Sequence, residues 1–232
     1  MIGLKNSRRI LLAVIMVGPG LALVPRPVFA DGGGNVQPPK AKPHGYSLTD
    51  MASAIALFST SGNNSQYYPD TPFQILAEDA STVVVTPENG GLVVTGGNSF
   101  TVPSGTPFFV AMYYADDSPP VYGTFPTSPW KAAGYIFDRS QLGANNFAII
   151  VDGEYTSIDS SYVAGPVLTS PLLDGGGTHF ISVGAFLTPL SVGTHTVTML
   201  GTVSGDAFVA GAGVSFLSAV FTYNVKVVAG HK

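Results

Sequence analysis

The chain has 232 residues, no cysteine and a formal net charge of −4. The lack of cysteine excludes disulfides, thiolate catalysis and cysteine-ligated metals. The acidic balance disfavours nucleic-acid and anionic-membrane partners, because a negative surface repels phosphate groups. Hydrophobic residues make up 45% of the chain, which is enough to fold a domain although only 10% of residues are charged.

The amino terminus has the pattern of a secretory signal. Basic residues and no acid precede an apolar run over residues 10–24, and Val28 and Ala30 occupy the two positions that signal peptidase reads. An apolar run of roughly 15 residues is short of the ~20 needed to cross a bilayer. We therefore expect residues 1–30 to be a signal peptide cleaved after Ala30, with an uncleaved membrane anchor as the alternative.

The export route stays open between two pathways. Arg8 and Arg9 before an apolar pair resemble a twin-arginine signal, and Arg26 would hinder the ordinary Sec route, yet two arginines also occur by chance. Removing residues 1–30 leaves six basic residues against 14 acidic ones, a net charge of −8. The expected product is an exported acidic protein that folds without disulfides, in the periplasm, on the cell surface or outside the cell.

A tether and a helix are expected next. Residues 31–45 are rich in Gly and Pro without apolar periodicity, which indicates a flexible tether. Residues 47–59 carry apolar residues at helical spacing, with Ser47 as the amino-terminal cap and Asp50 complementing the helix dipole. Residues 46–80 are thus assigned to a helix and a connecting segment.

Strand patterns dominate the chain from residue 81 onward, and helical signals are nearly absent after residue 61. The expected strands cover residues 83–85, 92–94, 100–102, 108–114, 147–151, 180–186, 194–199 and 214–228. Residues 87–91 and the pair Asp152-Gly153 have the composition of hairpin turns. The pattern predicts an all-β, two-sheet sandwich over residues 81–230, jelly-roll-like or immunoglobulin-like, preceded by the short helix.

One uncharged stretch, residues 207–225, is long enough to span a bilayer. Its glycines, hydroxyl residues, β-branched residues and aromatics are more typical of two strands. We therefore expect no membrane span after signal cleavage.

Four segments carry a resemblance. They read FTVPSGTPFF at residues 100–109, IVDG at 150–153, LSVGTHTV at 190–197 and FTYNVKV at 221–227. In this order they resemble a group of bacterial exported β-proteins, over roughly residues 98–228, and the last two segments are the sharper ones. The resemblance implies a β architecture and export; it brings no activity, cofactor or site residue.

Motifs for chemistry are missing. The histidines, His44, His179, His195 and His231, lack metal-ligand spacing, and HExxH, G-x-S-x-G, phosphate-loop and EF-hand patterns do not occur. We therefore predict no catalytic residue, no metal and no cofactor. A serine–histidine–acid triad scattered along the chain stays open, because triads depend on geometry rather than spacing.

The most unusual cluster combines aromatics with carboxylates. Tyr113, Tyr114, Asp116 and Asp117 lie close together, and the only tryptophan, Trp130, follows. Such side chains can stack on a sugar ring and accept its hydroxyl hydrogens, and the aspartates could hold calcium; the alternative is an aromatic turn packed at the edge of the sandwich. These five residues are the candidate ligand-binding residues.

The leading hypothesis is an exported, non-catalytic binding or structural protein of the bacterial envelope or exterior. A carbohydrate-binding module that uses the candidate residues is the first alternative. A secreted hydrolase is the second. The expected partner is a glycan or an envelope protein, and nucleic acid is excluded on charge.

Overall fold

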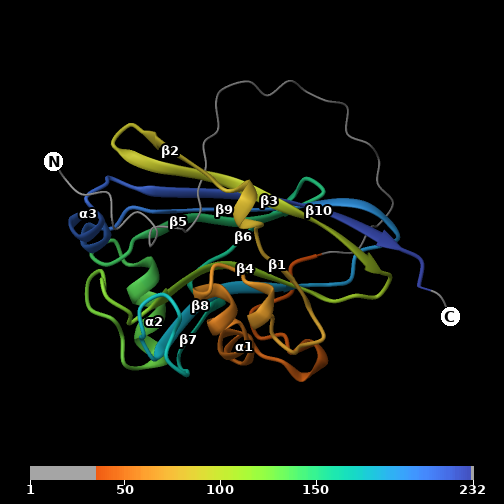
Figure 1. Ribbon diagram of the computed structural model, residues 1–232, viewed down its shortest axis with the longest axis horizontal. Coiled ribbons are helices and arrows are strands. Elements are labelled where there is room, and N and C mark those ends of the chain that lie inside the picture. The colour runs from red at the N-terminus through yellow and green to blue at the C-terminus, as the bar shows by residue number, and fades with distance from the viewer. Residues whose placement is uncertain (1–34, 231–232) are drawn as a thin grey trace.

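The computed structural model describes residues 35–230, so the expected signal peptide lies outside the described part of the chain. The described chain is mostly β, with ten strands in two mixed sheets and three α-helices. The two sheets form two layers, with one helix beneath the smaller sheet and two at one end (Figure 1). The expectation of a β-rich, two-sheet arrangement is confirmed at this level.

The smaller sheet has four strands and the larger has six. In spatial order the smaller sheet contains β1 (Gln74–Leu76), β4 (Phe108–Asp116), β8 (His179–Leu187) and β7 (Val163–Leu168). The larger contains β2 (Val84–Glu88), β3 (Gly91–Pro103), β10 (Leu217–Val228), β9 (Gly193–Val203), β5 (Ala144–Val151) and β6 (Glu154–Ser157). Each sheet holds one parallel pair, β1–β4 and β10–β3, among antiparallel neighbours.

Two hairpins follow directly from turn chemistry. Asn89-Gly90 joins β2 to β3, and Asp152-Gly153 joins β5 to β6. All four residues have positive φ, between 47° and 90°. A two-residue turn of this kind matches the twist of the flanking strands and favours Asn, Asp and Gly. Both predicted hairpins are confirmed.

The predicted helix, α1 (Leu48–Thr60), begins at a capping box. The Asp50 N–H donates to Ser47 Oγ at 3.2 Å, and the Ser47 N–H donates to Asp50 Oδ2 at 2.7 Å. Met51 and Ile55 are buried, and the helix packs against β7 and β8. It therefore covers the outer face of the smaller sheet (Figure 1).

The segment before α1 also contacts the domain. Val36 forms a β-bridge with Leu187, and the Gln37 N–H donates to the Phe186 carbonyl at 2.8 Å. The Tyr162 hydroxyl donates to the Gln37 carbonyl at 3.2 Å. Backbone and side-chain donors thus attach residues 36 and 37 to the domain, and the assignment of residues 31–45 as a tether stays a prediction.

Helices after residue 61 correct the sequence expectation. In α2 (Pro129–Phe137), Pro129 occupies the first turn, where its missing N–H costs nothing, and Ala132, Tyr135 and Ile136 are buried at helical spacing. The second, α3 (Asp206–Ala212), takes up the start of the uncharged stretch, which therefore holds one short helix and one strand rather than two strands. Both helices are too short for a clear periodic signal. Among the described residues, no helix is long and apolar enough to cross a bilayer.

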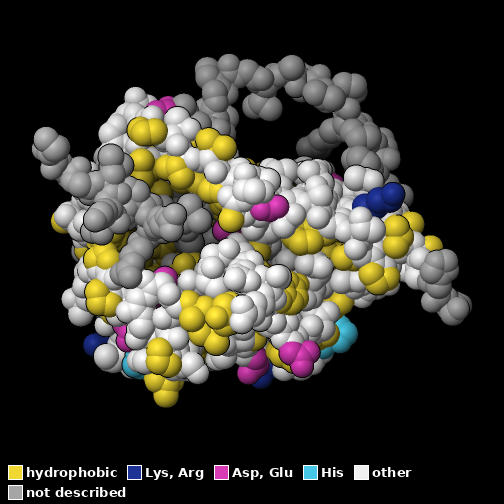
Figure 2. Space-filling view, viewed as in Figure 1, with side chains coloured by type: hydrophobic (Ala, Val, Ile, Leu, Met, Phe, Trp, Pro, Cys, Tyr) yellow, Lys and Arg dark blue, Asp and Glu magenta, His cyan; other side chains and the backbone are white. Residues whose placement is uncertain are grey.

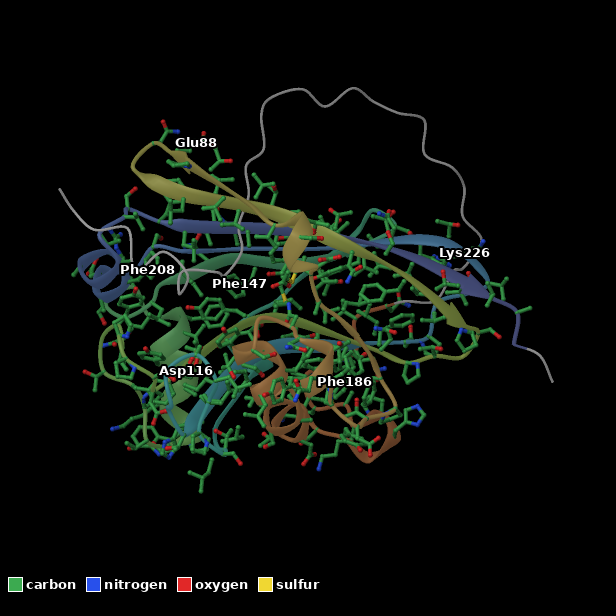
Figure 3. All side chains as sticks on the ribbon, in the orientation of Figure 1. Glu88, Asp116, Phe147, Phe186, Phe208 and Lys226 are labelled. Atoms are coloured by element: carbon green, nitrogen blue, oxygen red, sulfur yellow. The ribbon has the colours of Figure 1, made fainter. Side chains whose placement is uncertain are left out.

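The main core lies between the two sheets. On β10 the alternating residues Phe221, Tyr223, Val225 and Val227 are buried, as their spacing of two predicts. Phe147 of β5 points into the same space (Figure 3).

Candidate functional site

The candidate site begins where β4 loses a neighbour. β1 pairs with β4 over only three positions, which end at Leu76 and Val110. Farther along, β8 pairs with one edge of β4 as far as Asp116, with a bulge between Ala111 and Tyr113. Within residues 35–230 no strand pairs with the other edge over this length. The second half of β4 therefore has one free edge, and side chains from both of its faces reach the space beside it.

Tyr113 and Tyr114 occupy this free edge. As neighbours in a strand they leave opposite faces of the sheet. Tyr113 packs edge-on against Phe147 of the larger sheet at 6.0 Å between ring centroids, and Tyr114 stacks on Phe180 of β8 at 5.3 Å. Burial raises the pKa of both phenols, so they stay neutral. In the described part of the chain neither hydroxyl has a hydrogen-bond partner.

Two hollows of about 530 Å³ each meet at these tyrosines. Both are lined by Tyr113, Tyr114 and Asp174. The first extends to the end of α1 and to the segment after β1; the second extends to α2 and α3. Glu78 lines the first hollow, and Asp116, Tyr122, Tyr135 and Phe208 line the second. Together the two hollows are called the tyrosine cleft, and Figure 3 shows Asp116, Phe147 and Phe208 at this end of the molecule.

A pair of carboxyl groups lies in the cleft. Asp116 ends β4, and Asp174 comes from the loop between β7 and β8. Asp116 Oδ1 accepts a hydrogen bond from the Ser118 N–H at 2.7 Å, and the Ser118 hydroxyl donates to Asp174 Oδ1 at 3.2 Å. The Ser118 hydroxyl also accepts from the Gly177 N–H at 3.0 Å. Ser118 thus holds the two carboxyl groups in position.

Asp116 keeps its proton to a higher pH than an ordinary carboxyl group does. Burial of the Asp116 carboxyl and the neighbouring charge of Asp174 raise the Asp116 pKa to about 6, against the lowering effect of its hydrogen bonds from Ser118. Ser118 is hydrogen-bonded to both carboxyl groups, so a charge on Asp174 lies close enough to disfavour a charge on Asp116. Near pH 6 the cleft can therefore gain or lose one charge.

Glu78 is a third acid in the cleft. Burial raises the pKa of its carboxyl, against the lowering effect of hydrogen bonds from its own backbone and from Asn63. The Asn63 side chain also donates to the Glu78 carbonyl at 3.3 Å. Sequence reasoning missed both Glu78 and Asp174 as cleft residues. Neither lies in a recognisable motif, and each is brought to β4 by a loop that is distant in sequence.

Three of the five candidate residues come together and two do not. Tyr113, Tyr114 and Asp116 line the cleft. Asp117 instead pairs with His179, Nδ1 to Oδ2 at 2.8 Å, and its other oxygen accepts the N–H groups of Thr178 and His179. These hydrogen bonds hold the Asp117 pKa below its usual value despite partial burial. The Asp117 carboxylate therefore has a structural role in fastening the β7–β8 loop.

Trp130 lies outside the cleft. Its side chain is 78% exposed at the start of α2, and the Lys131 ammonium lies 4.9 Å from its ring centroid. It lines neither hollow of the tyrosine cleft. A ligand in the cleft would therefore contact tyrosine rings rather than the tryptophan.

A serine, a histidine and an aspartate do converge elsewhere. His195 Nδ1 lies 2.6 Å from Asp152 Oδ2, and His195 Nε2 lies 3.4 Å from the Ser191 hydroxyl. Nε2 is closer to the Ser191 carbonyl, at 2.9 Å. A carbonyl only accepts hydrogen bonds, so Nε2 must carry a proton here and cannot act as the base for Ser191.

The surroundings of His195 also favour a structural role. His195 is buried in β9, and Asp152 accepts the Thr196 N–H at 2.8 Å while donating its own N–H to the Thr196 carbonyl at 2.9 Å. None of the three residues of this group lines the tyrosine cleft. The group ties the β5–β6 turn to β9.

Comparisons with known proteins give no indication of function, so the function must be inferred from the geometry of the site. No family model, curated protein or solved structure matches the chain. Within the described residues, no three histidines or acids gather in a group that could hold a metal ion.

Asp116→Asn is expected to stabilise the protein at pH 8 and to have little effect at pH 4. The native pKa of about 6 lies above the ordinary value of 3.8, so the carboxyl favours folding below pH 4 and loses that contribution as pH rises through 6. A shift of this size corresponds to ~3 kcal/mol, reduced to about 1–2 kcal/mol because solvent in the cleft screens the charge. An asparagine keeps the acceptor for Ser118 without the charge. Urea unfolding at both pH values measures the difference.

The matched control is Asp138→Asn. Hydrogen bonds from the Ser140 N–H and hydroxyl lower the pKa of this exposed carboxyl. Its contribution is therefore present above the unfolded pKa and is lost as pH falls, the opposite sign. If the Asp116 variant gained no more stability at pH 8 than the Asp138 variant, the raised pKa of Asp116 would be wrong.

Proposed function

We propose that this chain is an exported, non-catalytic binding protein that holds a small organic ligand in the tyrosine cleft. The observation that carries the proposal is the meeting of two hollows at Tyr113 and Tyr114, whose hydroxyls have no partner within the described chain. Small-molecule sites are concave, largely apolar and contain a few convergent polar groups, with typical volumes of ~300–1,000 Å³. Each hollow falls within that range.

The position of the cleft supports binding over a purely structural role. An unpaired strand edge, and phenol hydroxyls that open into a hollow, can form hydrogen bonds with water or with a ligand. The protein keeps both at one place, beside carboxyl groups with raised pKa values, and such clusters mark functional sites. Residues 1–30 supply the argument for export to the bacterial envelope or exterior. The two layers fit a β-sandwich, and a jelly-roll or immunoglobulin-like type stays a prediction.

A carbohydrate ligand remains one class within this proposal. Tyrosine rings and carboxyl groups can together contact a sugar, but the tryptophan expected to take part lies outside the cleft. The hydrolase alternative has less support, because His195 Nε2 is hydrogen-bonded to a carbonyl.

Saturation-transfer NMR and calorimetry with a probe panel test the proposal. The panel contains neutral sugars (glucose, cellobiose, maltotriose), phenols (4-ethylphenol) and organic amines (choline, tyramine, spermidine). The double variant Tyr113→Phe/Tyr114→Phe removes only the two hydroxyls. We expect at least one probe to bind the wild type and to bind the variant about 5–30-fold more weakly, since each neutral hydrogen bond contributes ~0.5–1 kcal/mol.

Tyr155→Phe is the matched control, because Tyr155 is 60% exposed on β6 and lines neither hollow. Its affinity should equal that of the wild type. The proposal fails if no probe binds the wild type, or if the double variant binds every probe as the control does.

A further inference from the structure

The tyrosine cleft contains acids without bases. Glu78, Asp116 and Asp174 line it, and neither hollow is lined by Lys, Arg or His. Two histidines could carry a positive charge, but each is paired with an acid outside the cleft: His179 with Asp117, and His195 with Asp152. Figure 2 also shows few Lys and Arg side chains on the face it presents. No protein cation among the described residues neutralises the cleft.

Three acids in a partly dry site are costly without a counter-charge. A buried carboxylate is stabilised by pairing or by taking up a proton. In the protein alone, the Asp116 carboxyl takes up a proton near pH 6. A bound cation would pair with the carboxylate instead, so that the proton is no longer needed.

The tyrosine rings that line the cleft also favour a positively charged ligand. Tyr113 and Tyr114 lie in both hollows, and Tyr122 and Tyr135 line the second. The face of a tyrosine ring attracts a cation within about 6 Å of its centroid, and aromatic cages bind organic ammonium groups on this basis. Anionic ligands are repelled by the three acids, and a neutral sugar would leave their charge uncompensated.

The size of the cleft argues for an organic cation over a bare metal ion. Each hollow of about 530 Å³ is of the size that holds a small molecule. Within residues 35–230 the acids do not form a group of three that could ligate a metal. The ligand should therefore carry its positive charge on an organic framework that fills the space between the tyrosines.

We infer that the tyrosine cleft binds an organic ammonium compound, whose cationic nitrogen lies against the Asp116–Asp174 pair and whose apolar body contacts Tyr113 and Tyr114. This inference rests on the proposed binding function and names the ligand class. Binding moves the Asp116 proton to the solvent, and the positive charge of the ammonium group takes its place; a primary ammonium also donates hydrogen bonds to the carboxylates, whereas a quaternary one acts through its charge alone. The occupied cleft then carries the same net charge as the empty cleft with its proton.

Calorimetry with matched probe pairs tests the ligand class. Choline is compared with 3,3-dimethylbutan-1-ol, and tyramine with 4-ethylphenol, so that each pair shares the apolar body and differs in the cationic nitrogen. At pH 7.5 at least one amine should bind tenfold or more tightly than its neutral partner. The double variant Asp116→Asn/Asp174→Asn should lose this preference, while Asp138→Asn should keep it.

The pH dependence supplies an independent readout. The groups that face Asp116 are Asp174 from the β7–β8 loop, Tyr135 from α2 and Tyr113 and Tyr114 from its own strand. The tyrosines stay neutral, so the Asp116 carboxyl, with its pKa of about 6, governs the pH dependence in this range. Amine affinity should rise about three- to tenfold from pH 5 to pH 7.5. At pH 5.5, titrations in buffers of different ionisation enthalpy should show release of a proton on binding.

Two outcomes separate the inference from the proposed function. If neutral probes bind as tightly as amines and the Tyr113→Phe/Tyr114→Phe variant weakens them, the ammonium inference is wrong and the binding function stands. If no probe of any class binds, both fail. Amine binding that the carboxamide variant retains in full would also overturn the inference, since the carboxyl pair would then have no part in it.

Discussion

Gly97→Ala is expected to lower the free energy of unfolding by about 3 kcal/mol, at the upper end for an overpacked site. A Cβ at Gly97 would overlap the carbonyl oxygen of Thr222 on the neighbouring strand. The strand cannot move away freely, because β3 and β10 pair in parallel over twelve positions. The Gly97 N–H and carbonyl are also both hydrogen-bonded to the Thr82 hydroxyl, at 3.1 and 2.8 Å. Urea unfolding of the purified protein measures the loss.

Gly134→Ala is the control for this substitution. Gly134 lies in α2, and a Cβ there would meet no atom within 4 Å. Alanine favours a helix over glycine by ~0.5–1 kcal/mol, so this variant should be slightly more stable than the wild type. Equal stability of the two variants would contradict the close β3–β10 approach.

Phe186→Ala is expected to destabilise the protein by about 3–5 kcal/mol, the usual range for a phenylalanine removed from a core. Phe186 on β8 is 1% exposed. Its ring lies 5.0 Å from that of Phe73, which precedes β1, and 5.3 Å from that of Phe109 on β4. These three rings join the segment after α1 to the middle of the smaller sheet. Denaturant unfolding followed by circular dichroism measures the loss.

Two further variants make the Phe186 prediction specific. Phe186→Leu keeps most of the buried volume and should cost well under half as much. Leu168→Ala removes a side chain that is 75% exposed at the end of β7, and should change stability by less than ~0.5 kcal/mol. A Phe186→Ala variant no less stable than Leu168→Ala would rule out this aromatic cluster as part of the core.

The candidate site was only partly readable from sequence. Tyr113, Tyr114 and Asp116 were found because they are adjacent on one strand, and adjacent residues stay together in any fold. Asp174 lies 58 positions after Asp116, in a glycine-rich loop that is indistinguishable from an ordinary turn. Trp130 was included because it is the only tryptophan, but its place at the exposed start of α2 depends on which face of that helix is buried.

The role of His195 also could not be read from the sequence, because it depends on which atoms the fold brings to its ring. His195 was correctly placed on an alternating strand, where it is buried and hydrogen-bonded. Its closeness to Ser191 and Asp152 would suggest a triad on distance alone. The shorter contact to the Ser191 carbonyl assigns the proton to Nε2 and removes the base. Only atomic geometry makes that distinction.

Local features of the chain followed from local physics. Asn89-Gly90 and Asp152-Gly153 form tight turns because these residues tolerate positive φ, and Ser47 begins a helix because its hydroxyl accepts a free N–H. The β-rich character followed in the same way from alternation along the strands.

Long-range pairing decided the rest. The parallel pairing of β10 with β3 joins residues more than 120 positions apart, and the short β1 leaves half of β4 with a free edge. No local sequence pattern predicts either feature, because both depend on which strands pair with each other when the sheets assemble. The tyrosine cleft lies along that free edge, and its acids come from the end of β4, from the segment after β1 and from the β7–β8 loop.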